Sequence, residues 1–152
     1  MLFFVDCFCM RVCIGGTFDH LHKGHIALIN KAFKVAGDDG FVFIGLTLRK
    51  MDSKKNDIQC FAKRKQNLEN FLEQKKSDVE YDIRSISDKY GPSIEGDFDA
   101  IVVSPETKHV ALEINSEREK IDKKPLKIFI IDYVLSSDGK PISSSRIRND
   151  KI

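Results

Sequence analysis

The segment 11–25 constrains the fold more than any other part of the chain, because it joins an apolar run to a helical pattern through two adjacent glycines. The apolar run is 11–14, the glycines are Gly15 and Gly16, and the helical pattern is 25–36. Glycines at such a junction let a ligand approach the backbone closely, since they carry no Cβ. The unpaired N–H groups at a helix start favour an anion. The segment therefore predicts a phosphate site between a strand and a helix.

Two histidines, His22 and His25, lie three residues apart at this helix start and therefore near one face of its first turn. Histidine donates hydrogen bonds, and its charge is easily tuned near neutral pH. A single histidine here would be typical of a surface or capping residue. Two of them beside a glycine pair favour binding of a polyphosphate.

Apolar runs alternate with helical patterns along the rest of the chain. Further strands are predicted at 41–46, 79–86, 98–103 and 127–133, and further helices at 61–76, from Pro105 after an N-cap at Ser104, and from Ile142 to Arg148. This order predicts an α/β fold, a Rossmann-like five-stranded parallel sheet with helices on both faces. We expect one domain over 1–152. Residues 1–9 are either an N-terminal extension or the result of an upstream start, since Met10 directly precedes the first strand.

Composition narrows the function classes. With 25 Lys and Arg against 23 Asp and Glu, the formal charge is +2, which argues against a dedicated nucleic-acid binder. The apolar start contains Asp6 and is too short to span a bilayer, so we expect a cytoplasmic protein without a membrane partner. No apolar stripe demands a partner, which favours a monomer. The cysteines lack a second pair at zinc-ribbon spacing, so we expect no metal ligands among Cys7, Cys9, Cys13 and Cys60.

A basic stretch follows the strand at 41–46. For most such lysine clusters a solvated loop is the correct interpretation. This one, however, leaves the carboxyl end of a parallel strand, where open α/β sheets bind their ligands. One of Lys50, Lys54 and Lys55 could therefore reach phosphates, and spacing alone does not decide which.

Other segments offer weaker candidates. Thr107 and Asn115 lie about two turns apart on one predicted helix, so both could face one cleft. Arg64 is expected to be solvated on its helix rather than to face the site. Tyr90 and Gly91 follow a strand, where a plain turn is favoured over substrate contact.

The last predicted helix begins with three serines and an arginine, which make a second candidate phosphate cradle from Ser143, Ser144, Ser145 and Arg146. Three strings then occur together. They are Gly-Thr-Phe-Asp-His-Leu-His-Lys-Gly-His at 16–25, Val-Val-Ser-Pro-Glu-Thr at 102–107 with Ala-Leu-Glu-Ile-Asn at 111–115, and Asp-Gly-Lys-Pro-Ile-Ser-Ser-Ser-Arg-Ile-Arg at 138–148. In order and spacing they resemble the phosphopantetheine adenylyltransferases of the archaeal and eukaryotic type, within the HIGH-motif nucleotidyltransferase superfamily.

The resemblance implies transfer of an adenylyl group from ATP to 4′-phosphopantetheine, with Mg²⁺, to give dephospho-coenzyme A and pyrophosphate. Attack by a substrate phosphate on the α-phosphorus needs positioning and charge stabilisation rather than a protein nucleophile. Two alternatives stay open. One is another small-molecule nucleotidyltransferase, such as a cytidylyltransferase or a flavin-nucleotide synthase. The other is a non-catalytic nucleotide-binding module.

The resemblance also implies roles for individual residues. The catalytic set would be His22, His25 and Lys50. ATP would be bound by Gly16, Thr17, Phe18, His25, Ser143, Ser144, Ser145 and Arg146. The substrate would be bound by Thr17, Lys50, Lys54, Thr107 and Asn115.

Overall fold

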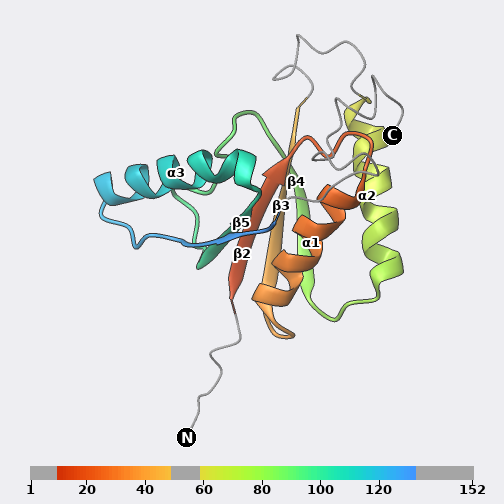
Figure 1. The fold of residues 1–152 in the computed structure, drawn as a ribbon, viewed down its shortest axis with the longest axis horizontal. Helices are drawn as coiled ribbons and strands as arrows, with labels where there is room; N and C mark the ends of the chain where they lie inside the picture. The colour runs from red at the N-terminus through yellow and green to blue at the C-terminus, as the bar shows by residue number, and fades with distance from the viewer. Residues whose placement is uncertain (1–9, 49–58, 133–152) are drawn as a thin grey trace, which may run out of the picture.

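The computed structural model describes residues 10–48 and 59–132, which form one parallel sheet covered by helices (Figure 1). In chain order the elements are β2 (Arg11–Gly16), α1 (Lys23–Ala36), β3 (Phe41–Thr47), α2 (Phe61–Lys75), β4 (Glu80–Ile86), β5 (Ala100–Val103), the 3₁₀ turn η2 (Pro105–Thr107), α3 (Lys108–Lys120) and β6 (Lys127–Ile130). The predicted five-stranded parallel sheet is confirmed.

The strand order is β4-β3-β2-β5-β6, so the chain reverses its direction across the sheet between β2 and β5. From β2 it moves outward through β3 to β4, and it then returns to β5 on the other side of β2. Gly15 pairs with Gly45 on one side of β2, and Cys13 pairs with Ile101 on the other. At such a reversal the connections leave in opposite directions and open a crevice at the carboxyl ends of the strands.

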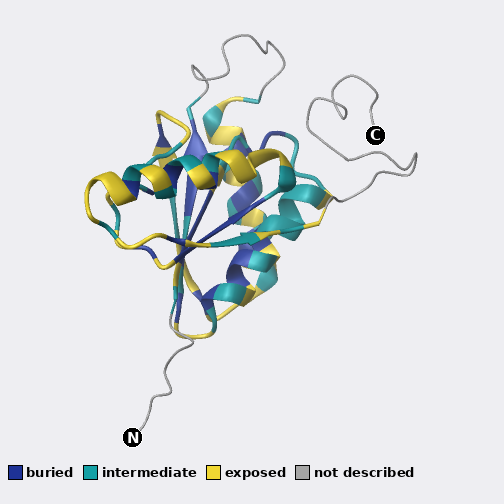
Figure 2. Ribbon diagram, turned by 60° about the vertical axis from the view of Figure 1, so that its left-hand side comes forward, coloured by how far each residue is buried: buried dark blue, intermediate teal, exposed yellow. Residues whose placement is uncertain are grey.

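Alternate residues of β2 point to opposite faces of the sheet, as strand geometry requires. Val12 and Ile14 belong to the larger hydrophobic cluster, together with residues of α1 and α2. Cys13 belongs to a second cluster, which it shares with Ala111 and Ile114 of α3. The sheet is therefore buried on both faces, with α1 and α2 on one side and α3 on the other (Figures 1 and 2). This confirms the predicted layers.

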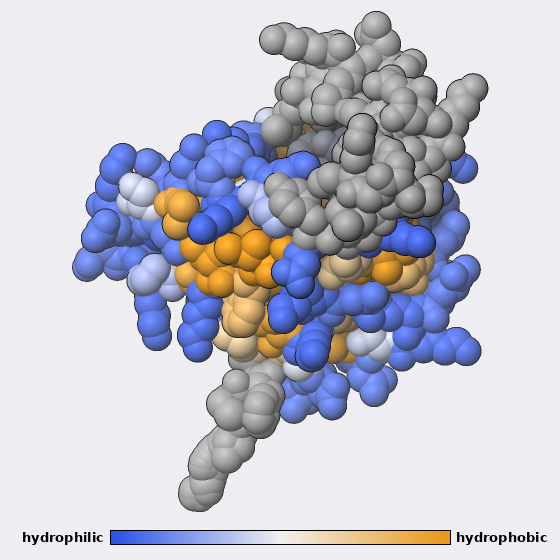
Figure 3. Space-filling view, viewed as in Figure 1, coloured by the Kyte–Doolittle hydropathy of each residue, from blue (hydrophilic) through white to orange (hydrophobic). Residues whose placement is uncertain are grey.

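The outer strand β6 is more exposed than the central strands. Ile130 at its end is 42% exposed, whereas all four residues of β5 are buried. Hydrophobic residues gather on the face of the molecule along which β6 runs (Figure 3). Within the described part of the chain, no helix combines the length and the apolar character needed to cross a membrane.

Candidate active site

The loop that follows β2 holds two bulky residues in an unusual backbone conformation. Phe18 and His20 both have φ of 49°, in the left-handed region that non-glycine residues rarely occupy. Each such residue costs about 1 to 3 kcal/mol, and the conformation persists only where the surrounding structure enforces it. The Phe18 side chain is 2% exposed and packs in the larger cluster. The buried Asp19 accepts the N–H of Gln59 at 2.9 Å, and Gln59 Oε1 accepts the N–H of His20 at 3.2 Å. The loop is therefore fixed from both sides.

The two predicted histidines cap the helix that follows this loop. His22 is the N-cap of α1, and its Nδ1 accepts the N–H of Gly24 at 3.0 Å. His25 Nδ1 accepts the N–H of His22 at 3.2 Å. The two rings stack with centroids 3.8 Å apart and planes inclined by 19°. Since each Nδ1 accepts a hydrogen bond, the proton of each neutral ring sits on Nε2.

The helix thus begins at Lys23, and the prediction that it begins at His25 is wrong by two residues. Histidine is not among the usual N-cap residues, which are Ser, Thr, Asp and Asn. The sequence pattern therefore placed the start too late.

Both rings are neutral at pH 7 in the ligand-free protein. Burial, and then the charge of His22, lowers the pKa of His25 to about 3. The Phe18 ring contributes to this enclosure, with its centroid 5.3 Å from that of His25. Burial, and then the charge of His20, also lowers the pKa of His22. The histidines are therefore neutral hydrogen-bond donors through Nε2.

Arg64 lies beneath the site with no exposed surface, so the prediction that it is solvated is wrong. Its Nη1 donates to the carbonyl oxygens of Thr17 at 3.0 Å and Thr47 at 2.8 Å, and its Nε donates to that of Gln59 at 2.9 Å. Helical periodicity placed Arg64 on the same side as Leu68, which is buried. Periodicity does not show that carbonyl groups elsewhere in the chain are available to pair with a buried cation.

Two threonines also contact each other through their side chains: Thr17 directly follows β2, and Thr47 is the last residue of β3. Thr47 Oγ1 donates to Thr17 Oγ1 at 3.2 Å. Thr17 was predicted from the motif, whereas Thr47 was not. The only signal for Thr47 in the sequence is its position at the end of a buried strand, which many residues share.

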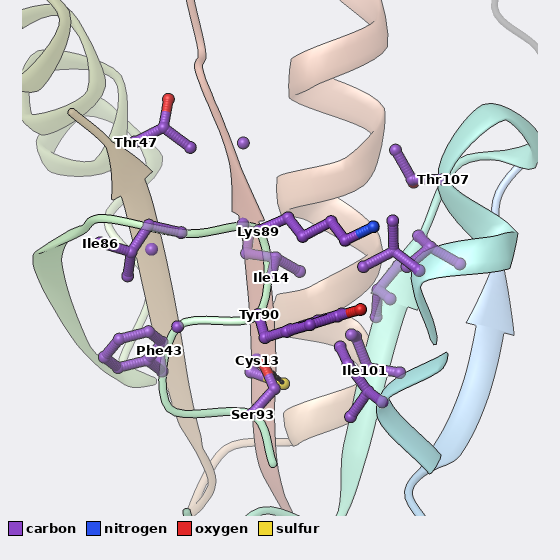
Figure 4. A pocket seen from close by; sticks show the side chains of 18 of the residues that line it. Cys13, Ile14, Phe43, Thr47, Ile86, Lys89, Tyr90, Ser93, Ile101 and Thr107 are labelled. Carbon is purple, nitrogen blue, oxygen red and sulfur yellow. Dashed lines mark hydrogen bonds between the residues drawn. The ribbon is translucent and has the colours of Figure 1, made fainter. Parts of the chain in front are cut away.

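A cavity of about 230 Å³ opens at the carboxyl ends of the central strands (Figure 4). Its lining combines backbone of the glycines in β2 and β3 with side chains from the loop after β4 and from the start of α3. Representative lining residues are Gly15, Gly16, Gly45, Thr17, Thr47, Ile86, Tyr90, Gly91, Thr107, Val110 and Ile114. Tyr90 and Gly91, predicted as a turn, thus line the cavity. Figure 4 shows Lys89 and Tyr90 extending from their loop across it.

A polar contact joins that loop to α3. Tyr90 donates its hydroxyl to Glu113 Oε1 at 2.8 Å, and Lys89 Nζ lies 2.9 Å from the same oxygen. These hydrogen bonds, from Lys89 first and then from Tyr90, lower the pKa of Glu113. The contact holds one wall of the cavity against the other.

Cys13 also lines the cavity but is not suited to nucleophilic catalysis. Burial raises the pKa of its thiol to about 11, although Ser93, whose Oγ lies 3.8 Å from Sγ, opposes the shift. The thiol is therefore protonated at pH 7, whereas the reactive form of cysteine is the thiolate. The described part of the site offers donors and hydroxyls rather than an activated nucleophile.

The sequence and the fold of the chain both match those of known proteins. A family model described as cytidylyltransferase-like matches residues 13–150. The phosphopantetheine adenylyltransferase of Methanosarcina acetivorans is 48% identical over 143 residues, which are 93% of this chain and 91% of that protein. The chain belongs to the phosphopantetheine adenylyltransferase family. The family predicted from the three sequence strings is thereby confirmed.

Two solved structures support the fold of this family member. A protein of unknown function from Archaeoglobus fulgidus superposes with a TM-score of 0.72 at 38% identity, over 81% of this chain and 90% of that one. The pantoate-beta-alanine ligase of Francisella tularensis, solved with beta-gamma ATP and beta-alanine, gives a TM-score of 0.54 at 18% identity, over 94% of this chain and 66% of that one. At this identity, the second likeness concerns the fold alone.

Among the other predicted site residues, Thr107 lines the cavity and Asn115 does not. The Asn115 side chain donates to the carbonyl of Leu126 at 3.0 Å and accepts its N–H at 2.8 Å. The prediction that Thr107 and Asn115 face one cleft is therefore wrong, because Asn115 instead ties α3 to the segment before β6. Lys50, Lys54, Lys55, Ser143, Ser144, Ser145 and Arg146 lie outside the described residues.

We expect Asn115→Ala to lower the free energy of unfolding by about 1 to 3 kcal/mol, because it leaves the Leu126 amide without its partner. The KM for the acceptor should stay within about twofold of wild type, since a side chain engaged elsewhere makes no uniform contribution to substrate binding. Urea denaturation and steady-state kinetics measure the two quantities. Ser116→Ala, on an exposed position of the same helix, is the control. A raised KM with unchanged stability would show that Asn115 binds substrate.

Proposed function

We propose that the chain transfers the adenylyl group of ATP to 4′-phosphopantetheine. A phosphate oxygen of the acceptor forms the new bond to the α-phosphorus of ATP. The bond from the α-phosphorus to the bridging oxygen breaks, and pyrophosphate leaves with that electron pair. Two observations support this most. The start of α1 carries a pair of neutral Nε2 donors, and the Thr17 and Thr47 hydroxyls contact each other where they line the cavity.

At the ATP end, His22 and His25 donate from Nε2 to phosphate oxygens, and His25 serves the α-phosphate. A neutral donor suits this task because it is already oriented by its Nδ1 contact, so little reorganisation accompanies the reaction. The backbone of Gly16 and Phe18 helps to seat the nucleotide. We assign the opposite side of the triphosphate to Ser143, Ser144, Ser145 and Arg146 on their motif alone.

At the acceptor end, Thr17 holds the attacking phosphate near the α-phosphorus, and the cavity takes the pantetheine arm. Its mainly apolar lining, with Tyr90 and Thr107 as polar groups, suits a chain of methylene and amide groups. Thr107 therefore stays in the proposed acceptor site, whereas the contacts of Asn115 give it a structural role. Lys50 or Lys54 is proposed, from the sequence, to bridge the two phosphates.

Mg²⁺ would enter with ATP and neutralise charge on the triphosphate. Magnesium keeps several waters and is commonly held by substrate phosphates with one or two carboxylates. Within residues 10–48 and 59–132, no three His, Cys, Asp or Glu side chains form a group that could hold a metal ion. We further propose a monomeric, cytoplasmic enzyme without a nucleic-acid partner, in keeping with the net charge of +2.

The test is a screen of nucleotide and acceptor pairs that follows pyrophosphate release. Pyrophosphate should be released faster from ATP with 4′-phosphopantetheine than from CTP with glycerol 3-phosphate or from ATP with riboflavin phosphate. Adding EDTA should abolish this release. Equal or greater turnover with CTP would favour a cytidylyltransferase. Nucleotide binding without turnover on any acceptor would instead indicate a binding module.

A further inference from the structure

We propose that Arg64 is a positioning residue of the adenylyl transfer, because it sets the separation of the strand ends that carry Thr17 and Thr47. The inference rests on the proposed function in one respect, namely that Thr17 contacts the attacking phosphate. It assigns no contact between Arg64 and substrate.

The bonds of Arg64 lie where the β2–β3 ladder ends. The paired register runs from Arg11 with Phe41 to Gly16 with Leu46. Thr17 and Thr47 are the next residues along the two strands, and a single nitrogen, Nη1 of Arg64, donates to both of their carbonyl oxygens. The guanidinium thus takes the place of a further rung, and it joins the two strands at the edge of the crevice.

A third bond fixes the guanidinium itself. Its Nε donates to the carbonyl of Gln59, the residue that also holds Asp19 and His20. Arg64 therefore connects the strand ends to the loop that follows β2 through one buried group. A planar fork of donors can span three carbonyls in fixed directions, whereas the ammonium of lysine is a compact charge on a flexible stem.

The position of the strand ends determines the direction of the threonine hydroxyls. Thr47 Oγ1 donates to Thr17 Oγ1 at 3.2 Å, so Thr17 uses a lone pair in this contact and directs its own hydrogen elsewhere. A small change in the separation of the carbonyls would break this contact and displace the Thr17 hydroxyl. A misplacement of about 1 Å at a reacting group can lower turnover about 100-fold.

The experiment compares Arg64→Lys with Leu72→Ala, a core change on the same helix that does not touch the site. We expect Arg64→Lys to lower kcat by about 10- to 100-fold while the KM for ATP changes less than about threefold. Leu72→Ala should lower the Tm at least as much as Arg64→Lys does, but it should leave kcat unchanged at temperatures below its Tm. Adding ethylguanidinium should restore part of the kcat of Arg64→Ala, because the small cation can occupy the vacated site.

A double mutant tests whether Arg64 acts through the threonine pair. Thr47→Val removes the hydroxyl and keeps the shape of the side chain. If Arg64 acts through the contact between Thr17 and Thr47, the double variant should lower kcat little more than Arg64→Lys alone. The reason is that both substitutions break the same contact. If the fold-loss of kcat in the double variant equals the product of the losses in the two single variants, Arg64 does not act through Thr47.

A second readout does not depend on the reaction. Methyl NMR of threonine-labelled protein should show shifted Thr17 and Thr47 signals in Arg64→Lys and unshifted ones in Leu72→Ala. Arg64 would be a purely structural residue if the threonine signals of Arg64→Lys were unshifted and if its kcat fell only in proportion to its loss of stability. A wild-type protein inactive on every nucleotide and acceptor pair would overturn the proposed function, while the NMR result would still decide whether Arg64 positions the threonines.

Discussion

His25→Ala should lower kcat by about 100- to 1,000-fold, the usual effect of losing one oriented donor to a transition-state charge. The Kd for ATP should change far less, because the contact is expected to strengthen as negative charge develops around the α-phosphorus. Single-turnover kinetics and equilibrium titration with ATP measure the two effects. If affinity and turnover fell by the same factor, His25 would be only a binding residue.

The alanine variant alone is ambiguous, because His25 also accepts the N–H of His22 at the start of α1. Losing a cap costs about 0.5 to 2 kcal/mol of stability. Two further variants separate the roles. In His25→Asn the amide oxygen can replace Nδ1, but no donor reaches the position of Nε2. In His25→Gln the amide nitrogen can approach the position of Nε2, but the capping acceptor is displaced.

We therefore expect His25→Asn to keep most of its stability and to be nearly as slow as His25→Ala. His25→Gln should be less stable than His25→Asn and recover part of the turnover. The opposite ranking, with the asparagine variant faster than the glutamine variant, would mean that the cap rather than the Nε2 donor controls turnover.

The elements of the fold follow from local patterns, and the sequence therefore predicted them well. The run from Phe41 to Leu46 is apolar at every position except Gly45, as expected for a strand covered on both faces, and it forms β3. Ser104 and Pro105 carry the signals of a helix start, and Ser104 is the N-cap of η2. The strand order was not predicted, because the pairing of β2 with β5 depends on contacts between residues far apart in the chain.

The site was predicted only where its chemistry is local. His22 and His25 belong to one turn, so their proximity followed from spacing. Arg64 was misassigned because its partner Thr17 lies 47 residues away and offers only a backbone carbonyl, which every residue has. Asn115 was misassigned for the same reason, since its partner is the backbone of Leu126.

The protonation state of the histidines also depends on tertiary structure. Nothing in the spacing of His22 and His25 shows that the rings stack or that Phe18 encloses them. Histidine alone has an ordinary pKa near 6.5, and burial rather than sequence lowers it. Because the pKa of these histidines is lower in the folded protein than in the unfolded chain, the free energy of unfolding depends on pH, and this can be measured without substrate.

Wild-type protein should lose stability as the pH falls from about 6.5 towards 3, and His25→Asn should lose less. The pKa of His25 is about 3 in the folded protein, below its ordinary value of 6.5, so the unfolded chain binds more protons between these limits. Unfolding therefore becomes more favourable as the pH falls through this window. Because one pKa unit is worth about 1.4 kcal/mol, the contribution of His25 is at most about 5 kcal/mol. His22 acts in the same direction.

Urea denaturation of wild type and His25→Asn at pH 7.5, 6, 5 and 4 isolates this contribution, because the carboxylates shared by both proteins cancel in the difference. The gap between the two unfolding free energies should shift in favour of His25→Asn as the pH falls. Parallel curves would show that His25 titrates normally. Bound ATP should work against the shift, since phosphate charge favours the imidazolium and raises the pKa of His25. ATP binding near pH 5 should therefore take up protons in wild type and take up fewer in His25→Asn, as calorimetry in buffers of different ionisation enthalpy can measure.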